Sequence, residues 1–198
     1  MTVDIRMAHA GDAAGILGIY APYCESTTVS FEIVAPTREQ MSERIARISA
    51  AYPWLVAEVD DRIAGYVYAT RFRERAAYQW TAEVAVYIAI NRQRRGLGRA
   101  LYTSLFSILR AQGYSKAIAG ITVPNPASAR LHESLGFKHT GIFPGVGFKD
   151  GQWLDVGWWQ LELQPEMCDP SEPRPFSALR ESAAVTAALY EGRQLANR

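Results

Sequence analysis

Residues 91–100 read NRQRRGLGRA and lie between an apolar run, VAVYIAI (84–90), and a helix-like stretch, LYTSLFSILRAQG (101–113). The ten residues contain four arginines and two glycines. An apolar strand that runs through a glycine turn into a helix is a favourable place for an anion, because backbone amides converge there and the helix dipole adds positive potential. Glycine also lets a ligand approach the main chain closely. The stretch therefore predicts a binding site for phosphate groups.

Three phosphate-binding motifs can be compared with this turn. A P-loop requires GxxxxGK followed by Ser or Thr, which is absent. A dinucleotide fingerprint requires a third glycine where Leu101 stands, and an acidic residue about 20 positions later, which is also missing. The pattern Q/R-x-x-G-x-G/A is met by residues 93–98, QRRGLG. A tight strand-to-helix turn with no ligand is the structural alternative, but the flanking strand and helix favour a pyrophosphate site.

The rest of the chain alternates between predicted strands and helices. Strands are predicted at VDIRMA (3–8), WLVAEV (54–59), RIAGYVYAT (62–70), TAEVAVYIAI (81–90) and KAIAGIT (116–122), and helices after Asp12, Thr37, Gly96 and Asn125. Asp60-Asp61 and Asp150-Gly151 predict two antiparallel hairpins. Asp12 is expected to cap the first helix with its carboxylate.

Composition indicates a globular protein whose charge is unevenly distributed. The chain has 198 residues, with 48% hydrophobic and 21% charged residues and a net charge of +1. Residues 84–132 contain no Asp or Glu and seven Lys or Arg, which leaves 14 basic and 20 acidic residues elsewhere. This local field favours an anionic ligand. The two cysteines lack the spacing of metal ligands, and no apolar run is long enough to span a membrane. The start of the sequence also does not resemble a signal peptide, so we expect a cytoplasmic protein.

The composition changes after Leu163. Residues 165–176, PEMCDPSEPRPF, contain four prolines and predict an extended linker. The following residues, 177–198, favour a helix but show only a weak apolar face, so docking on the domain, docking on a partner and fraying all stay open. We therefore expect a domain at 1–164 and a proline-rich linker with a helical tail at 165–198.

The glycine turn and its neighbours resemble the pyrophosphate motif of the GNAT N-acetyltransferases, which use acetyl-CoA. More narrowly, the chain is similar to the phosphinothricin and methionine sulfoximine N-acetyltransferases from about residue 5 to residue 163. The resemblance is carried by STTVSFE (26–32), AYQWTAEVAVYI (77–88), QRRGLGRALYTSL (93–105), PNPASARLHESLGF (124–137) and GFKDGQWLDVGWWQ (147–160). It implies an α/β (α+β) GNAT fold, a mixed twisted sheet flanked by helices, and direct acetyl transfer from acetyl-CoA to an amine without a metal.

Three residues are candidates for the chemistry of acetyl transfer. A protonated amine has no lone pair, so a base is required. Glu83 lies in an apolar strand, where its pKa should be raised, and the resemblance places it at the position of the base; a solvated or arginine-paired glutamate is the alternative. His132 titrates in a suitable range and matches a histidine of the family, although a lone helical histidine is more often structural. Tyr102 could protonate the leaving thiolate or be a buried aromatic.

The resemblance also assigns binding residues. Acetyl-CoA is expected on the strand at Val84, Ala85, Val86, Tyr87 and Ile88, on the turn at Arg94, Arg95, Gly96, Leu97, Gly98, Arg99 and Ala100, and on Asn125 and Ser128. Asn125 can cap its helix with the side-chain oxygen and keep its amide protons for the pantetheine chain. The acceptor is expected at Phe31, Arg73, Arg75, Tyr78, Glu83 and Tyr87, with Val156 from a second subunit. The guanidinium group of an arginine can donate two parallel hydrogen bonds to the oxygens of a carboxylate or phosphinate. The family's herbicide-detoxifying members have lysine where this chain has Arg73. Arginine keeps the positive charge of lysine, but its planar guanidinium forms hydrogen bonds with a different geometry.

The predicted partners are a small amino-acid-like acceptor and a second copy of the chain, without nucleic acid or membrane. Another amine is an enzymatic alternative: a protein N-terminus, a polyamine or an aminoglycoside. A polyamine would require an acidic acceptor loop, and residues 70–80 are rich in arginine. A non-catalytic module that binds nucleic acid through residues 92–99 is the alternative from another class, but the aromatic platform of single-strand binders is missing there.

Overall fold

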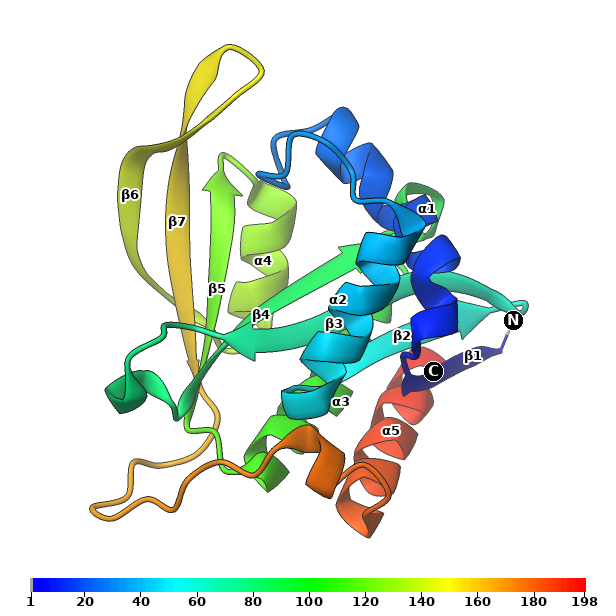
Figure 1. Cartoon of the computed structure of the whole chain (residues 1–198), viewed down its shortest axis with the longest axis vertical. Helices are drawn as coiled ribbons and strands as arrows, with labels where there is room; N and C mark the ends of the chain where they lie inside the picture. Colours follow the sequence, from blue (N-terminus) through cyan, green and yellow to red (C-terminus); the bar gives the residue numbers. More distant parts are fainter. Residues whose placement is uncertain (1) are drawn as a thin grey trace.

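The structure, a computed structural model, describes residues 2–198. Its centre is one seven-stranded sheet with the order β1-β2-β3-β4-β5-β7-β6 (Figure 1). The strands are β1 (Val3–Met7), β2 (Trp54–Val59), β3 (Arg62–Arg71), β4 (Thr81–Ile88), β5 (Lys116–Val123), β6 (Lys138–Lys149) and β7 (Gln152–Glu162). The helices are α1 (Ala13–Glu25), α2 (Arg38–Ala51), α3 (Leu97–Gln112), α4 (Pro126–Ser134) and α5 (Ala183–Ala196). Only β4 and β5 pair in parallel, so the predicted mixed sheet flanked by helices is confirmed.

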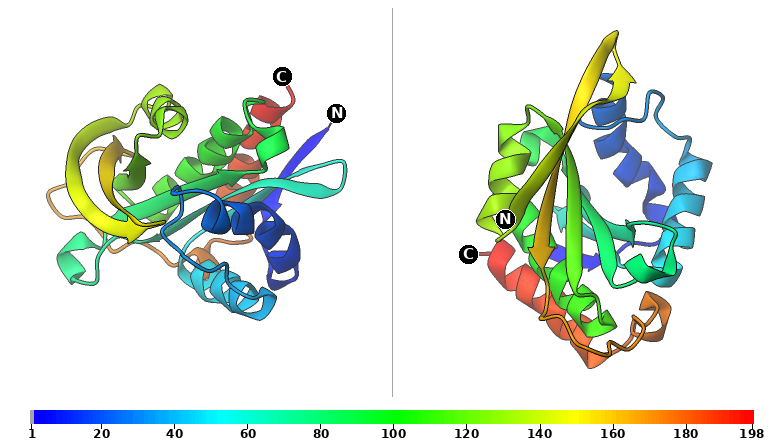
Figure 2. Two further views of the ribbon diagram at one scale, coloured as in Figure 1. Left: turned by 90° about the horizontal axis from the view of Figure 1, so that it is seen from above. Right: turned by 90° about the vertical axis from the view of Figure 1, so that its left-hand side faces the viewer.

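Helices cover both faces of the β1–β4 half of the sheet. Figure 2 shows α1 and α2 on one side and α3 and α5 on the other. In β2, Trp54 and Val56 join the apolar cluster of α1 and α2, whereas Leu55 and Ala57 join the cluster of α3 and α5. A strand that is buried on both faces needs apolar residues at consecutive positions. This explains why residues 54–57 are uniformly apolar.

Both predicted hairpins are present. Asp60 and Asp61 have φ angles of 51° and 58°, and they join β2 to β3. Asp150 and Gly151 have φ angles of 49° and 76°, and they join β6 to β7. Two consecutive residues with positive φ form the tight turn whose twist matches that of paired strands, and Asp and Gly tolerate this conformation. The β6–β7 hairpin projects beyond the rest of the molecule (Figure 1).

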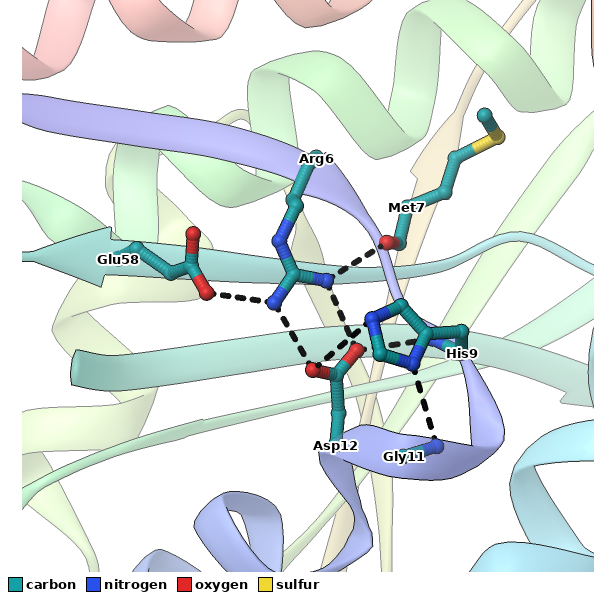
Figure 3. A network of polar contacts seen from close by, with 6 residues as sticks. All are labelled: Arg6, Met7, His9, Gly11, Asp12 and Glu58. Carbon is teal, nitrogen blue, oxygen red and sulfur yellow. Dashed lines mark hydrogen bonds and ion pairs between the residues drawn. The ribbon is translucent and has the colours of Figure 1, made fainter. Parts of the chain in front are cut away.

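The expected capping role of Asp12 is wrong. Asp12 precedes α1, but its carboxylate makes no capping bond to that helix. It accepts two hydrogen bonds of 2.8 Å from Arg6 and one of 2.8 Å from the backbone N–H of His9 (Figure 3). Burial alone would raise the pKa of Asp12, but the hydrogen bonds from Arg6 and His9 outweigh it and lower the pKa. Arg6 also reaches Glu58, so the network joins β1, β2 and the start of α1.

The C-terminal segment docks on the domain. Helix α5 lies against α3 and β1, and four of its residues are buried: Val185, Ala188, Leu189 and Gly192. Its last turn also reaches the free edge of β1, where Arg193 Nε donates to Ile5 O and Asn197 exchanges two hydrogen bonds of 2.8 Å with the backbone of Val3. These contacts satisfy backbone groups that an edge strand otherwise exposes. Of the three outcomes left open for the tail, docking on the domain is the one observed.

Candidate active site

The site begins where β4 and β5 separate. The two strands pair only from Thr81 to Glu83 and from Lys116 to Ile118, and beyond these residues no pairing joins them. The half of the sheet formed by β5, β6 and β7 is then steeply inclined to the half formed by β1 to β4 (Figure 1). The facing edges of β4 and β5 therefore lack strand partners beyond this point, and an extended ligand with amide groups can pair with them.

The predicted phosphate turn lies at the end of β4. Gly96 adopts a φ of 80° as the N-cap of α3, and Arg94 adopts a φ of 59° in the same turn. The first residues of a helix, here Leu97 to Arg99, have amides without an intrahelical partner. These amides and the helix dipole point toward the groove at the start of α3. The turn therefore has the geometry that binds a diphosphate.

The groove along this turn contains most of the predicted cofactor residues. It is lined by Tyr23, Val29, Val86, Tyr87, Ile88, Arg92, Gln93, Arg94, Gly96, Leu97, Gly98, Arg99, Asn125, Ala127, Ser128 and Leu131. A smaller, adjoining pocket is lined by Val84 and Ala85 of β4, by residues of β5, and by Tyr102 and His132. Arg95 is exposed but does not line the groove. The Ala100 N–H donates to Gly96 O over 3.0 Å, so that amide is used within the helix.

Tyr102 and His132 form a hydrogen-bonded pair in the adjoining pocket. His132 Nδ1 lies 2.8 Å from Ser128 O, and His132 Nε2 lies 2.9 Å from the Tyr102 hydroxyl. Because a carbonyl can only accept, Nδ1 carries the proton and Nε2 accepts from Tyr102 in the neutral ring. Burial lowers the pKa of His132, and the bond to Ser128 opposes this in part, while burial raises the pKa of Tyr102. Both groups are therefore neutral near pH 7.

Glu83 and Arg73 line a second cleft, on the other side of Tyr87 from the phosphate turn. Tyr87 lines both the groove along the phosphate turn and this cleft, which are called the cofactor groove and the acceptor cleft below because they contain residues predicted to contact those ligands. Burial raises the pKa of Glu83, and the positive charge of Arg73 lowers it only in part. Within residues 2–198 the Glu83 carboxylate makes no ion pair that would fix it as a structural anion. A carboxylate with a raised pKa can accept a proton, and the neighbouring guanidinium of Arg73 can bind an anionic group.

The amino-acid sequence matches the acetyltransferase (GNAT) domain over residues 5–158. The chain belongs to the GNAT acetyltransferases. It is 42% identical to a phosphinothricin N-acetyltransferase of Streptomyces viridochromogenes over 87% of this chain and 92% of that one. It is 36% identical to an L-methionine sulfoximine/L-methionine sulfone acetyltransferase of Salmonella typhimurium, over 84% of this chain and 100% of that one.

The fold of a solved GNAT acetyltransferase supports the same assignment. A phosphinothricin acetyltransferase from Sinorhizobium meliloti, in complex with acetyl-CoA, superposes with a TM-score of 0.83 at 32% identity, covering 89% of this chain and 98% of that one. This GNAT acetyltransferase is therefore an acetyl-CoA-dependent N-acetyltransferase. The opening between β4 and β5 and the free amides at Leu97 to Arg99 fit the pantetheine chain and the diphosphate of that substrate. No group of three or more His, Cys, Asp or Glu side chains suited to a metal ion occurs in residues 2–198.

Four of the six expected acceptor side chains of this GNAT enzyme meet in the acceptor cleft: Phe31, Arg73, Glu83 and Tyr87. Arg75 and Tyr78 do not line it. Arg75 is exposed, and Tyr78 packs edge-on against Phe72. Val156, expected from a second subunit, lines the cleft from the same chain.

Other lining residues were not predicted. They are Tyr20, Val29, Ser30, Glu32, Gly120, Thr122, Phe143, Val146 and Trp158. Most belong to the loop after α1 and to the β6–β7 hairpin, which lie far from Glu83 in the sequence, so a local pattern does not connect them with the cleft. Phe31, within the stretch STTVSFE (26–32), is the residue of this loop that the resemblance predicts as an acceptor contact.

Within the described residues, no helix is both long and apolar enough to cross a bilayer.

Proposed function

We propose that this enzyme acetylates the amine of a small amino acid with an anionic or strongly polar head group, such as phosphinothricin or methionine sulfoximine. The observation that carries the proposal is that Glu83 and Arg73 line one cleft, which meets the cofactor groove at Tyr87. Arg73 can bind a carboxylate, phosphinate or sulfoximine oxygen. Glu83 can then take the proton of the amine, directly or through a water. The names of the relatives support the same class of acceptor.

The transfer itself can be written with named groups. Glu83 takes one proton from the ammonium group, the free amine nitrogen attacks the thioester carbon, and the C–S bond breaks to release the CoA thiolate while the nitrogen loses its second proton. The free amides of β4 are suited to hold the thioester, and those of Leu97 to Arg99 the diphosphate. Tyr102 lies in the pocket where β4 and β5 separate. When its O–H turns from His132 Nε2 toward the sulfur, its proton can pass to the thiolate, and the second proton lost by the nitrogen restores the hydroxyl. We assign His132 the role of orienting this hydroxyl, because its Nε2 accepts from Tyr102 and His132 does not line the acceptor cleft.

A panel of acceptors tests the proposed function. Thiol release from acetyl-CoA should be fastest with phosphinothricin, methionine sulfoximine or methionine sulfone, slower with ordinary amino acids, and slowest with spermidine, an aminoglycoside and a peptide with an N-terminal alanine. If phosphinothricin is a good acceptor, expression should also protect bacteria against it. Preference for the peptide, the polyamine or the aminoglycoside would refute the proposal and select the corresponding alternative.

Tyr102→Phe tests the proposed acid. Removing the hydroxyl should lower kcat by about 100-fold and leave the KM for acetyl-CoA within about threefold, because the ring still fills its buried position. Steady-state kinetics with the best acceptor provide the measurement. Tyr190→Phe is the matched control, since Tyr190 is 60% exposed on α5. Unchanged kcat in Tyr102→Phe would leave the tyrosine without a role in the chemistry.

We also propose that the enzyme is a cytoplasmic homodimer. The projecting β6–β7 hairpin exposes Ile142, Phe143, Val146, Phe148 and Trp153, each between 49% and 70% exposed. Several large apolar side chains exposed on one projecting hairpin favour a protein interface there. Acetyl-CoA is an intracellular substrate, which supports the location. Sedimentation as a monomer at micromolar concentration would contradict the dimer.

A further inference from the structure

Lys149 is a buried cation that the proposed chemistry does not use. It ends β6 and is 4% exposed. Its Nζ donates to three backbone carbonyls: Cys24 O at 2.6 Å, Ser30 O at 2.8 Å and Glu32 O at 3.1 Å. These three bonds use all the protons of an ammonium group. Burying a charge is costly unless its hydrogen bonds are satisfied, so this position is built around the lysine.

Two of the three carbonyls belong to the segment that forms one wall of the acceptor cleft, and the third belongs to the end of α1 just before it. Cys24 O is among the last carbonyls of α1, where a positive charge is favoured. Ser30 and Glu32 lie in the following segment, residues 26–37, which forms neither helix nor strand. Val29, Ser30, Phe31 and Glu32 all line the cleft. Lys149 therefore joins the end of α1 to the middle of this loop through contacts that span 117 to 125 residues of sequence.

The same strand supports the loop at a second point. The Phe31 ring lies over Gly147, where an added Cβ would stand 2.1 Å from the ring. On the opposite side, the Glu32 carboxylate is bound by Arg44 of α2 at 2.6 Å. Phe31 is thus held between two anchored neighbours, Ser30 and Glu32, whose carbonyls both accept from Lys149.

We propose that Lys149 is a positioning residue for the acceptor: its three bonds fix the loop of residues 26–32, and with it Phe31, against the β6–β7 hairpin. The proposal rests on the proposed function, because it takes this cleft as the acceptor site. Lys149 touches neither the cofactor groove nor the acceptor cleft. Its loss should therefore weaken acceptor binding while binding of acetyl-CoA is preserved.

Lys149→Met tests this, with Lys138→Met as the matched control, because Lys138 is exposed at the other end of the same strand. The KM for the best acceptor should rise at least about tenfold in Lys149→Met, while the KM for acetyl-CoA stays within about twofold. Hydrogen exchange of the amides in residues 24–32 should become faster in this variant than in Lys138→Met. An unchanged acceptor KM together with unchanged exchange would overturn the proposal, and so would an equal loss of affinity for both substrates.

Lys149→Gln provides a milder test in case the methionine variant does not fold. Its shorter side chain carries two donors for three carbonyls, so a smaller rise in acceptor KM and a smaller increase in exchange are expected. Wild-type values for both would overturn the proposal. If the wild-type enzyme acetylates no amino acid of the panel, the proposed function fails, and the exchange measurement alone decides whether Lys149 holds the loop.

Discussion

Glu83→Gln is expected to lower kcat/KM for the acceptor by about 10²–10⁴-fold, the usual contribution of a general base. Glutamine keeps the size of the side chain but cannot accept the amine proton. Binding of CoA should stay within about twofold, because Glu83 lines the acceptor cleft and not the cofactor groove. Calorimetric titration with CoA and steady-state kinetics provide the two measurements. Near-wild-type turnover of Glu83→Gln at neutral pH would exclude Glu83 as the base.

The pH dependence gives a second readout for Glu83. Burial raises its pKa, so kcat/KM should rise with pH along a limb above the ordinary glutamate value of about 4.3, and Glu83→Gln should lose that limb. A raised folded-state pKa also means that the stability contributed by the protonated group is lost as pH rises through this pKa. At pH 7 the glutamine variant should therefore be at least as stable as the wild type. Low activity would then be a chemical effect and not unfolding.

Glu74→Gln is the matched control. Glu74 follows Arg73 in the sequence, but it is exposed and pairs with Arg71 on the surface. Its replacement should leave kcat/KM within about twofold, because exposed ion pairs contribute little. A comparable loss of activity in both variants would show that the net charge near the acceptor, and not a base at Glu83, governs turnover.

Gly192→Ala is expected to lower the free energy of unfolding by about 3 kcal/mol, although alanine favours helices. Gly192 lies on the face of α5 that contacts α3. An added Cβ would stand 2.1 Å from Ser104 Oγ and 2.8 Å from the backbone oxygen of Ala100. Since a main-chain atom of α3 cannot move aside easily, α5 must shift and loosen the contacts of Leu189 and Val185. Chemical denaturation measures the loss.

Gly18→Ala is the matched control for this substitution. Gly18 is exposed in α1, and an added Cβ would meet nothing within 4 Å. Alanine should there raise the free energy of unfolding by about 0.5–1 kcal/mol, since it is the better helix former and has less freedom in the unfolded chain. The two glycine variants should thus change stability in opposite directions. A stabilised Gly192→Ala would mean that α5 does not pack closely on α3 in solution.

The weak apolar pattern of the tail follows from the residues on the buried face of α5. Its buried face includes Ala188 and Gly192, small residues that allow close approach and add little to an apolar pattern. The expected helix was therefore found, but the surface it covers depends on β1, whose free edge lies at the other end of the sequence.

Local patterns predicted the elements that form a large part of the candidate site. Three of these elements depend only on residues close together in the sequence: the apolar strand β4, the glycine turn at residues 96 and 98, and the helix cap at Asn125. Each is found where the sequence predicts it. Glu83 could also be singled out, because a lone carboxylate in an apolar strand is unusual. Asp12 shows the limit of such patterns: its carboxylate could cap a helix or pair with Arg6, and only the position of β1 decided between the two.

The sequence by itself determined the order of the strands and helices along the chain, both aspartate turns and the glycine turn before α3, since each depends on backbone preferences and side chains close along the chain. The tertiary structure alone decided that β4 and β5 separate after Glu83, that α5 covers the edge of β1, and that Lys149 reaches Cys24, Ser30 and Glu32. These contacts join segments up to 194 residues apart. Their geometry follows from the packing of the whole sheet, to which every strand and helix contributes, and no local pattern encodes it.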